Sequence, residues 1–237
     1  MRDGEFRNPR LVSVYDASYG WSREDDFFVG VVGPVPARVL DLGCGTGRLA
    51  AGLAGLGHVV TGVDPARASV EAARRRGADV TWVEGTAADV TGPFDAALMT
   101  SHVSQVFDPD GWRDVLGRLA DALAPGGVLA FDTRDPAARR WERWNPEDSR
   151  RAVVVGGEVV VVWLEVVDLS WPSITFTQHY EFPGEKLAST STLWFRDQDE
   201  VRDSLVERGF TVEQVYGGWS REPVGHGAGE LIVIART

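Results

Sequence analysis

The chain has 237 residues, 43% of them hydrophobic, which is enough for one substantial core and indicates one domain with an elaboration rather than two equal domains. Its 24 basic and 35 acidic residues leave a net charge of −11, which disfavours nucleic acid and anionic membranes as partners and favours a small-molecule substrate. Cys44 is the only cysteine, which excludes an intrachain disulfide and a zinc site held by cysteines. No run approaches the roughly 18 apolar residues of a membrane span. We therefore expect a soluble cytoplasmic protein.

From residue 38 to about 132, short apolar runs alternate with helical patterns, which is typical of a parallel sheet with crossover helices. Strands are predicted at Arg38–Leu42, His58–Val63, Asp79–Glu84, Phe94–Met99 and Gly127–Asp132. Helices are predicted at Thr46–Leu56, Pro65–Arg76 and Asp110–Leu123, each closed by glycine or proline.

Beyond residue 150 the apolar period changes from 3.6 to 2, and a Gly156-Gly157 turn predicts a hairpin. Further alternating runs at 174–182 and 190–195 complete a predicted four-stranded antiparallel meander over 149–196. A helix from the N-cap Asp197 through residue 208 and strands at 210–216 and 230–235 follow. The order predicts an α/β protein with a doubly wound sheet, interrupted by an insertion after its fifth strand.

The most informative segment lies between the first strand and the first helix of this sheet. It reads Asp41-Leu42-Gly43-Cys44-Gly45-Thr46-Gly47-Arg48. Alternate glycines allow a tight turn and a close approach of the backbone to a ligand, and the next helix starts with unpaired N–H groups. A dinucleotide fingerprint needs a third glycine at position 48, where this chain has Arg48.

With Asp41 two residues before the first glycine, the segment resembles motif I of the class I S-adenosylmethionine-dependent methyltransferases. The order of elements is similar as well, most of all to small-molecule methyltransferases common in actinobacteria. The resemblance implies a Rossmann-like seven-stranded sheet of order 3-2-1-4-5-7-6, formed by residues 38–148 and 197–237. It also implies an N-terminal helical cap over residues 1–37 and a meander over 149–196 that covers the substrate or forms a dimer interface.

Asp64 ends the second predicted strand about twenty residues past the glycine loop, where a carboxylate accepts hydrogen bonds from ribose hydroxyls. The alternative is a helix cap, with Pro65 as the first helical residue. The resemblance implies that Asp41 orients the methionine end of the cofactor and that Thr86 and Ala87, or alternatively Asp89, contact the adenine. The expected cofactor-binding residues are Tyr15, Tyr19, Asp41, Gly43, Cys44, Gly45, Gly47, Asp64, Pro65, Thr86, Ala87, Met99 and Thr100.

The stretch from Phe94 to His102 resembles motif IV of the same family, whose residues flank the transferable methyl group. His102 follows a central strand, and an imidazole there is a candidate general base; the alternative is a histidine that caps a turn or hydrogen-bonds the substrate. The expected substrate-binding residues are Trp21, His102, Arg134, Trp141, Trp144 and His179. His226 is a weaker candidate base, and Trp163 and Trp194 are expected to pack the meander.

The sequence therefore predicts an enzyme that transfers a methyl group from S-adenosylmethionine to an oxygen or nitrogen of a small molecule, a secondary metabolite being one candidate. S-adenosylhomocysteine is the expected product, and no metal is expected. Two alternatives stay open: a catalytically silent module that binds S-adenosylmethionine or S-adenosylhomocysteine, and an NAD(P)-dependent oxidoreductase. A homodimer through the meander is a further hypothesis.

Overall fold

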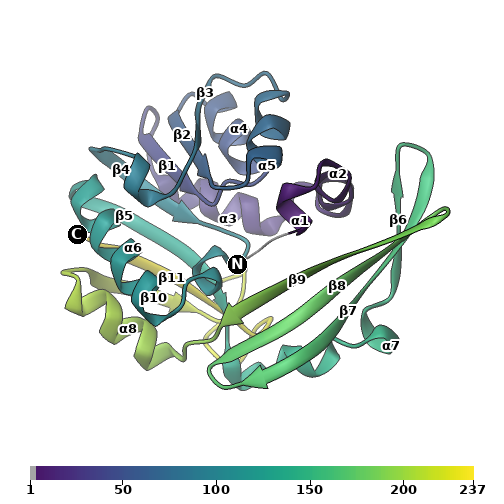
Figure 1. Cartoon of the computed structure of the whole chain (residues 1–237). Coiled ribbons are helices and arrows are strands. Elements are labelled where there is room, and N and C mark those ends of the chain that lie inside the picture. Colours follow the sequence, from purple (N-terminus) through teal and green to yellow (C-terminus); the bar gives the residue numbers. More distant parts are fainter. Residues whose placement is uncertain (1–3) are drawn as a thin grey trace.

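The computed structural model describes residues 4–237 and contains a seven-stranded and a four-stranded β-sheet (Figure 1). The strands of the large sheet are β1 (Arg38–Leu42), β2 (Val59–Asp64), β3 (Val80–Glu84), β4 (Phe94–Met99), β5 (Leu123–Arg134), β10 (Thr211–Tyr216) and β11 (Glu230–Arg236). They lie in the order β3-β2-β1-β4-β5-β11-β10, and β11 is antiparallel to both of its neighbours. Counted along this sheet, the order is 3-2-1-4-5-7-6, so the predicted fold is confirmed.

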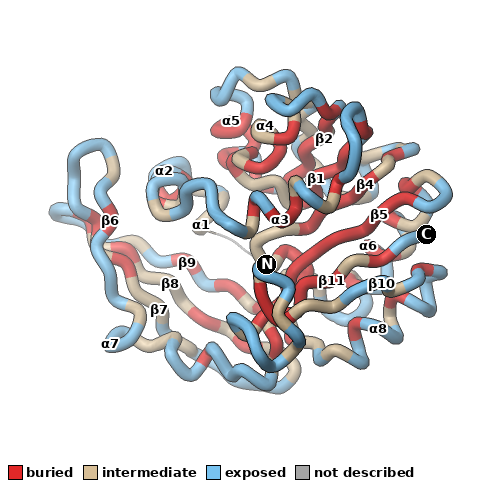
Figure 2. The backbone as a smooth tube through the Cα atoms, turned by 180° about the vertical axis from the view of Figure 1, so that it is seen from behind, coloured by how far each residue is buried: buried red, intermediate tan, exposed pale blue. Residues whose placement is uncertain are grey.

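Helices cover both faces of the large sheet. The helices are α1 (Gly4–Arg7), α2 (Pro9–Ser18), α3 (Arg23–Val32), α4 (Arg48–Gly55), α5 (Arg67–Arg74), α6 (Pro109–Ala122), α7 (Pro146–Ser149) and α8 (Gln198–Glu207). Apolar residues of α6 and α8 pack on one face, and those of α3 and α4 pack on the other. Figure 2 shows the result, with burial concentrated along the central strands β1, β4, β5 and β11.

The four-stranded sheet is the predicted meander. Its strands are β6 (Arg151–Val155), β7 (Glu158–Ser170), β8 (Ser173–Phe182) and β9 (Glu185–Trp194), paired in chain order and all antiparallel. Gly156 and Gly157 both have positive φ, at 58° and 88°, as a two-residue hairpin turn between right-twisted strands requires. Leu11 and Val14 of α2 pack against one face of this sheet.

Helices α1 and α2 lie between the two sheets, where they contact β6 and β9 of the four-stranded sheet and helix α5 of the other layer (Figure 1). The backbone amides of Gly4 and Glu5 donate to the Ser189 hydroxyl of β9, at 3.1 and 2.9 Å. On the other side, the Asp16 carboxylate accepts from the Thr46 hydroxyl and from the Arg76 guanidinium. The N-terminal helices therefore extend over the loop that follows β1.

Several predicted elements differ from the observed ones at their ends, and two of these differences have a clear local cause. The predicted turn before Gly127 lies inside β5, where the pairing with β4 shifts register and Gly126 adopts a φ of 76°. Helix α4 begins at Arg48 rather than Thr46, because Gly47, the N-cap of this helix, has a left-handed backbone conformation. No helix among the described residues is both long enough and apolar enough to cross a membrane.

Candidate functional site

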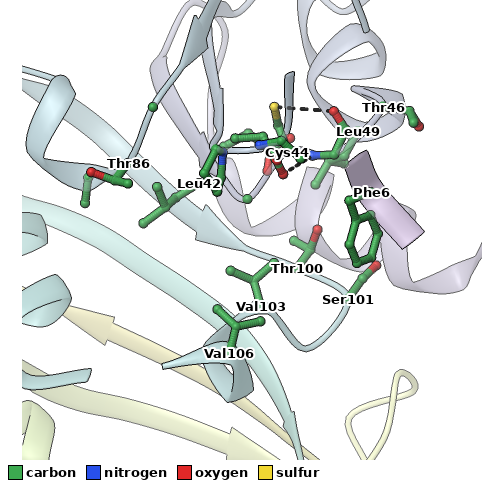
Figure 3. A pocket seen from close by; sticks show the side chains of 18 of the residues that line it. Phe6, Leu42, Cys44, Thr46, Leu49, Thr86, Thr100, Ser101, Val103 and Val106 are labelled. Carbon is green, nitrogen blue, oxygen red and sulfur yellow. Dashed lines mark hydrogen bonds between the residues drawn. The ribbon is translucent and has the colours of Figure 1, made fainter. Parts of the chain in front are cut away.

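A cavity of about 310 Å³ lies at the carboxyl ends of β1 and β2 (Figure 3). Its walls come from five places: the glycine loop, the end of β2, the segments after β3 and β4, and the N-terminal helices. Phe6 and Tyr15 from α1 and α2 form the side that faces away from the sheet. Ligands of open α/β sheets bind at this edge, which makes the cavity the candidate site.

The glycine loop is held against β2 by its own backbone. The amides of Gly43 and Cys44 both donate to the Val63 carbonyl, at 2.7 and 3.0 Å. Gly43 has a φ of 77°, and a Cβ there would lie 2.6 Å from a methyl carbon of Val103, so only glycine fits. Gly45 has a φ of 54°, but a Cβ there would meet no described heavy atom within 4 Å, so its backbone faces open space.

Asp64 connects the glycine loop to the helix after β2. Its Oδ2 accepts from the Gly45 amide at 3.0 Å, and its Oδ1 accepts from the Ala66 amide at 2.8 Å. The residue is buried yet lines the cavity. Ala66, not Asp64, is the N-cap of α5 (Arg67–Arg74), and no described side chain caps that helix, so Asp64 closes the turn before the helix rather than capping it. The same residue lines the space that a ribose would need.

Asp41 contributes a second carboxylate to the same cavity. It is 2% exposed, and no described group donates a hydrogen bond to its Oδ1. Burial, with a smaller contribution from the neighbouring Asp64 charge, raises the pKa of Asp41 to about 7. A buried acceptor atom without a donor is costly, so Asp41 marks a place where a ligand donor would be stabilising.

Cys44 lies in the same loop, and its thiol is not activated. Burial, and then the charges of Asp41 and Asp64, raise the pKa of this thiol well above its ordinary value of 9.0. A thiol that stays protonated is a poor nucleophile. Cys44 therefore serves the loop through its backbone amide rather than through sulfur chemistry.

The segment after β3 forms another wall of the cavity. Gly85, Thr86 and Ala87 line it, whereas Asp89 does not. The Asp89 carboxylate accepts from the Thr86 amide at 2.8 Å and from the Thr86 hydroxyl at 3.1 Å, closing a capping box. The carboxylate of Asp89 is therefore engaged in this short helix, and Thr86 and Ala87 are the residues placed to contact a ligand.

The chain turns sharply after β4. Ser101 and His102 both have positive φ, at 57° and 64°, which is uncommon for residues other than glycine. Two acidic side chains hold this turn: Glu24 accepts from the Ser101 amide at 3.0 Å, and Asp132 accepts from the His102 amide at 2.9 Å. Strained turns that are held this firmly cluster at functional sites, which directs attention to the His102 ring.

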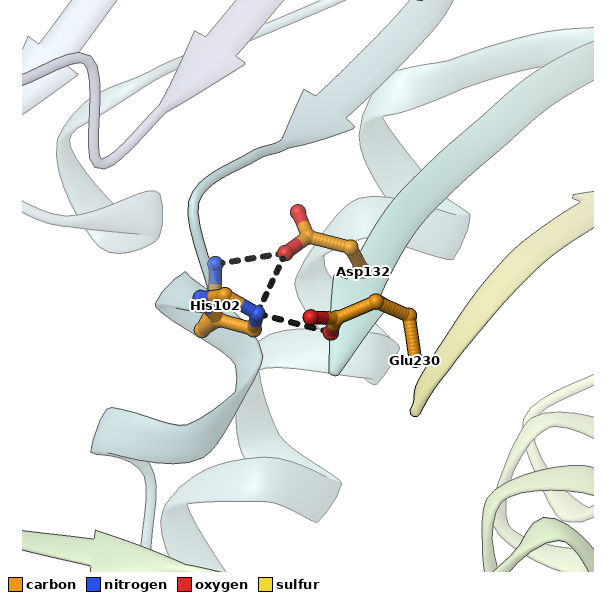
Figure 4. Close-up of side chains that lie close together, drawn as sticks. All are labelled: His102, Asp132 and Glu230. Atoms are coloured by element: carbon orange, nitrogen blue, oxygen red, sulfur yellow. Dashed lines mark hydrogen bonds and ion pairs between the residues drawn. The ribbon is translucent and has the colours of Figure 1, made fainter. Parts of the chain in front are cut away.

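The His102 ring lies against two buried carboxylates (Figure 4). Its Nε2 is 2.8 Å from Oε2 of Glu230 and 3.3 Å from Oδ2 of Asp132. Burial raises the pKa of Glu230 to about 7, and burial together with the charges of Glu24 and Glu230 raises the pKa of Asp132 well above its ordinary value. His102 itself follows Ser101 and precedes Val103, both of which line the cavity.

Sheet topology explains how these carboxylates meet. Asp132 on β5 pairs with Ile232 on β11, and Glu230 is two residues before Ile232 on the same strand. Side chains two residues apart share a face of a strand, so Asp132 and Glu230 lie diagonally on one face. The sequence prediction missed both residues and noted no such cluster, although Asp132 at the end of the fifth predicted strand was a usable signal.

Most of the residues expected to bind the cofactor line the cavity. These are Tyr15, Asp41, Gly43, Cys44, Gly45, Asp64, Pro65, Thr86, Ala87 and Thr100. Three do not: Tyr19 is exposed and packs on the Tyr15 ring, Gly47 caps α4, and Met99 is fully buried in the core. Lining residues that the sequence did not suggest include Phe6, Leu42, Leu49, Ser101, Val103 and Phe107.

The residues expected to bind the substrate are scattered. Trp21 is exposed and donates to Asp26, and the His179 ring stacks on Trp163 in the meander. Trp141 and Trp144 pack with Phe195 in a cluster under the meander.

Arg134 contacts the segment after β4, part of which lines the cavity. It donates to the buried Gln105 at 2.7 Å and stacks over Trp144. The remaining side chains have other surroundings: Trp194 is half-buried, and His226 is exposed in the loop before β11. Of the expected substrate-binding set, His102 and Arg134 are thus the two at the carboxyl edge of the large sheet.

Comparison with known proteins locates the similarity in the first half of the sheet. Residues 39–127 match a family model described as a methyltransferase domain. A ubiquinone biosynthesis O-methyltransferase of Xanthomonas oryzae pv. oryzae is 40% identical over an alignment of 112 residues that covers 43% of this chain and 46% of that protein. The chain thus matches about half the length of such curated relatives.

Solved structures extend the similarity to nearly the whole chain. An S-adenosylmethionine-dependent methyltransferase from Clostridium acetobutylicum superposes with a TM-score of 0.77 at 14% identity, covering 96% of this chain and 97% of that one. An S-adenosylmethionine-bound amino pentose methyltransferase from Micromonospora echinaspora gives 0.70 at 21% identity, covering 94% and 96%. At these identities the likeness establishes the shared fold, insertion included.

Proposed function

Because the chain carries a methyltransferase domain with the class I S-adenosylmethionine-dependent fold, we propose that it transfers a methyl group from this cofactor to an oxygen or nitrogen of a small molecule. One observation carries the proposal. In the cavity at the carboxyl ends of β1 and β2, a glycine backbone open to the ligand and two buried carboxylates, Asp41 and Asp64, face the same space.

The charge of this cavity distinguishes between cofactors. A dinucleotide would place its negatively charged pyrophosphate at the glycine loop, beside the buried Asp41, whereas Asp64 suits the ribose of either cofactor. S-adenosylmethionine instead carries a positive sulfonium and an ammonium group, and a cation beside a buried carboxylate favours the ionised acid. The orphaned Oδ1 of Asp41 and the position of Arg48 in place of a third fingerprint glycine both support the sulfonium cofactor.

Particular residues would hold each part of the cofactor. We propose that Asp64 accepts hydrogen bonds from the ribose hydroxyls and that Asp41 accepts from the ammonium group. Thr86 and Ala87 would contact the adenine, with Pro65 beside them on the cavity wall. When bound, S-adenosylmethionine supplies an electrophilic methyl group; the protein supplies alignment and exclusion of water.

The acceptor would approach from the side of Thr100, Ser101 and His102, with Arg134 as an anchor for an acidic group on the acceptor. The bound cofactor would supply the methyl group to the acceptor's oxygen or nitrogen and would leave as S-adenosylhomocysteine. The His102 imidazole would take up the acceptor's proton and pass it to solvent.

The test is transfer of label from S-[methyl-³H]adenosylmethionine to panels of hydroxylated and amino-bearing small molecules. We expect label in at least one acceptor, and a loss of most of it with Asp64→Ala but not with Asp79→Ala, a change at an exposed acid outside the cavity. Binding of S-adenosylhomocysteine without transfer to any acceptor would instead favour a silent binding module.

Two further parts of the proposal concern the setting of the protein. We place it in the cytoplasm, which fractionation of producing cells tests.

We also propose a homodimer that covers the exposed Val167, Leu169 and Trp171 of the meander. Light scattering at several protein concentrations tests the dimer, and a monomer throughout would remove it.

A further inference from the structure

We propose that Asp132 and Glu230 are positioning residues for His102, forming with it one proton-sharing cluster that fixes the ring orientation and its tautomer. The inference rests on the proposed function, because it explains how His102 would act as a base. It adds two residues that neither the sequence motifs nor the matched domain points to, since both lie beyond residue 127.

The geometry at the ring fixes the tautomer. Nε2 lies 2.8 Å from Glu230 Oε2, a hydrogen-bond distance, with Asp132 Oδ2 next to it at 3.3 Å. When Glu230 is ionised its carboxylate only accepts, so the ring donates, and the neutral imidazole carries its proton on Nε2. Nε2 is then the donor to the cluster, and Glu230 and Asp132 hold the ring in this orientation.

The surroundings of the cluster favour a shared proton. Asp132 is fully buried and Glu230 is 6% exposed, so two ionised carboxylates side by side are costly there. The charged groups facing the cluster are Glu24 of α3, Arg134 of β5 and Arg140, which lies 3.8 Å from Glu230. Raised pKa values of Asp132 and Glu230 agree with a proton held between them and the ring.

The same three side chains also have the composition of a divalent-cation site, since their ligand atoms lie within 4.8 Å of one another. Two ligand atoms on one such ion are about 3.0 to 3.4 Å apart at ordinary bond lengths. The 2.8 Å contact is shorter than that, and Asp132 Oδ2 already accepts from the His102 amide. The geometry therefore favours a proton over a metal ion.

Asp132 also has a structural role, because its carboxylate accepts from the His102 amide in the strained turn. The test must therefore remove the negative charge while it keeps the hydrogen-bond acceptor. Asp132→Asn and Glu230→Gln each keep a carbonyl oxygen that accepts a hydrogen bond but remove a negative charge. Among the described residues, the Glu230 carboxylate contacts the His102 ring and not the backbone of the turn. Glu230→Gln therefore stays informative if Asp132→Asn fails to fold.

The experiment is ¹⁵N NMR of the four histidine rings in the presence of S-adenosylhomocysteine and EDTA, titrated from pH 5 to 9, with His102 assigned by His102→Gln. We expect a proton on Nε2 of the neutral ring and a titration midpoint that falls by about one pH unit in each variant. Glu165→Gln is the matched control, since Glu165 pairs with the His179 ring at 3.0 Å on the meander. It removes a carboxylate beside another histidine ring and should leave the His102 midpoint in place.

A proton on Nδ1, or a His102 midpoint unchanged in both variants, would overturn the proposal. So would loss of methyl transfer in EDTA with recovery in Mn²⁺, which would assign the cluster to a cation. The ring titration does not depend on turnover. A chain that binds no S-adenosylhomocysteine would refute the proposed function, while the titration still decides whether the cluster shares a proton.

Discussion

Replacement of Asp41 by asparagine should separate the stability of the fold from the binding of the ligand, because the two respond in opposite directions. Asp41 is almost completely buried, and its Oδ1 receives no hydrogen bond from any described residue. Burial raises its pKa from an ordinary value of 3.8 to about 7, so the folded protein binds a proton there that the unfolded chain has already released.

The sign and size of the effect follow from linkage. Between the two pKa values the native state binds one more proton than the unfolded state, so stability falls as pH rises, and the loss ends once pH passes about 7. The slope is about 1.36 kcal/mol per pH unit, which gives about 4 kcal/mol in full and about 2 kcal/mol between pH 5.5 and 8.5. Asp41→Asn cannot ionise, so it should not lose these 2 kcal/mol.

The assay is urea unfolding followed by tryptophan fluorescence at pH 5.5 and 8.5. Only the change in stability between the two pH values is compared, because an amide at position 41 has hydrogen-bonding needs of its own. Between pH 5.5 and pH 8.5, the free energy of unfolding of Asp41→Asn should rise by about 2 kcal/mol relative to that of the unmodified protein. Asp79→Asn, a change at an exposed acid, is the control and should follow the unmodified protein.

The same variant should bind S-adenosylhomocysteine about 10 to 100 times more weakly at pH 8.5, since it loses a charged acceptor for the ammonium group. Parallel stability curves for Asp41→Asn and the unmodified protein would refute the reasoning about burial. Unchanged affinity would refute the role of Asp41 in ligand binding, whatever the stability curves show.

Four further changes test other parts of the structure. Gly45→Ala places a methyl group in the open cavity and should weaken S-adenosylhomocysteine binding about tenfold or more by calorimetry, with about 1 kcal/mol of lost stability from its positive φ. Arg48→Met leaves the buried Asp25 carboxylate without its cation and should cost about 3 kcal/mol in urea unfolding; a loss below about 1 kcal/mol would contradict this. His102→Ala should lower turnover about 100-fold while S-adenosylhomocysteine affinity stays within about threefold, and unchanged turnover would remove it as a base. Arg196→Met removes donors to three backbone carbonyls between β4 and α6 and should lower the free energy of unfolding by about 2 kcal/mol or more, which urea unfolding measures.

The sequence predicted the sheet well because local pattern and chain order carry that information. Strands β1 and β4 begin and end at the predicted residues, and the Gly156-Gly157 turn identified its hairpin. Likewise, Asp64 stands out because a fixed distance along the chain separates it from the glycine loop. These features depend on neighbours in sequence, which periodicity and motif spacing can detect.

The acceptor side could not be predicted in the same way, because it is assembled by distant segments. Glu230 reaches His102 only because β11 enters the sheet antiparallel to β5, and Glu24 reaches Ser101 from a helix that precedes the whole sheet. Tryptophans are an ambiguous signal: Trp141 and Trp144 both pack in the cluster under the meander, and Trp144 also lines a second cavity. Composition alone does not tell a pocket wall from a core.

The central claim is that the cavity at the glycine loop binds S-adenosylmethionine through Asp64. The most direct test is calorimetric titration of the purified protein with S-adenosylhomocysteine and, separately, with NADH, using Asp64→Ala for comparison. We predict saturable binding of S-adenosylhomocysteine that Asp64→Ala weakens, and no binding of NADH. Binding of NADH in its place would contradict the claim and assign the glycine loop to a nicotinamide cofactor.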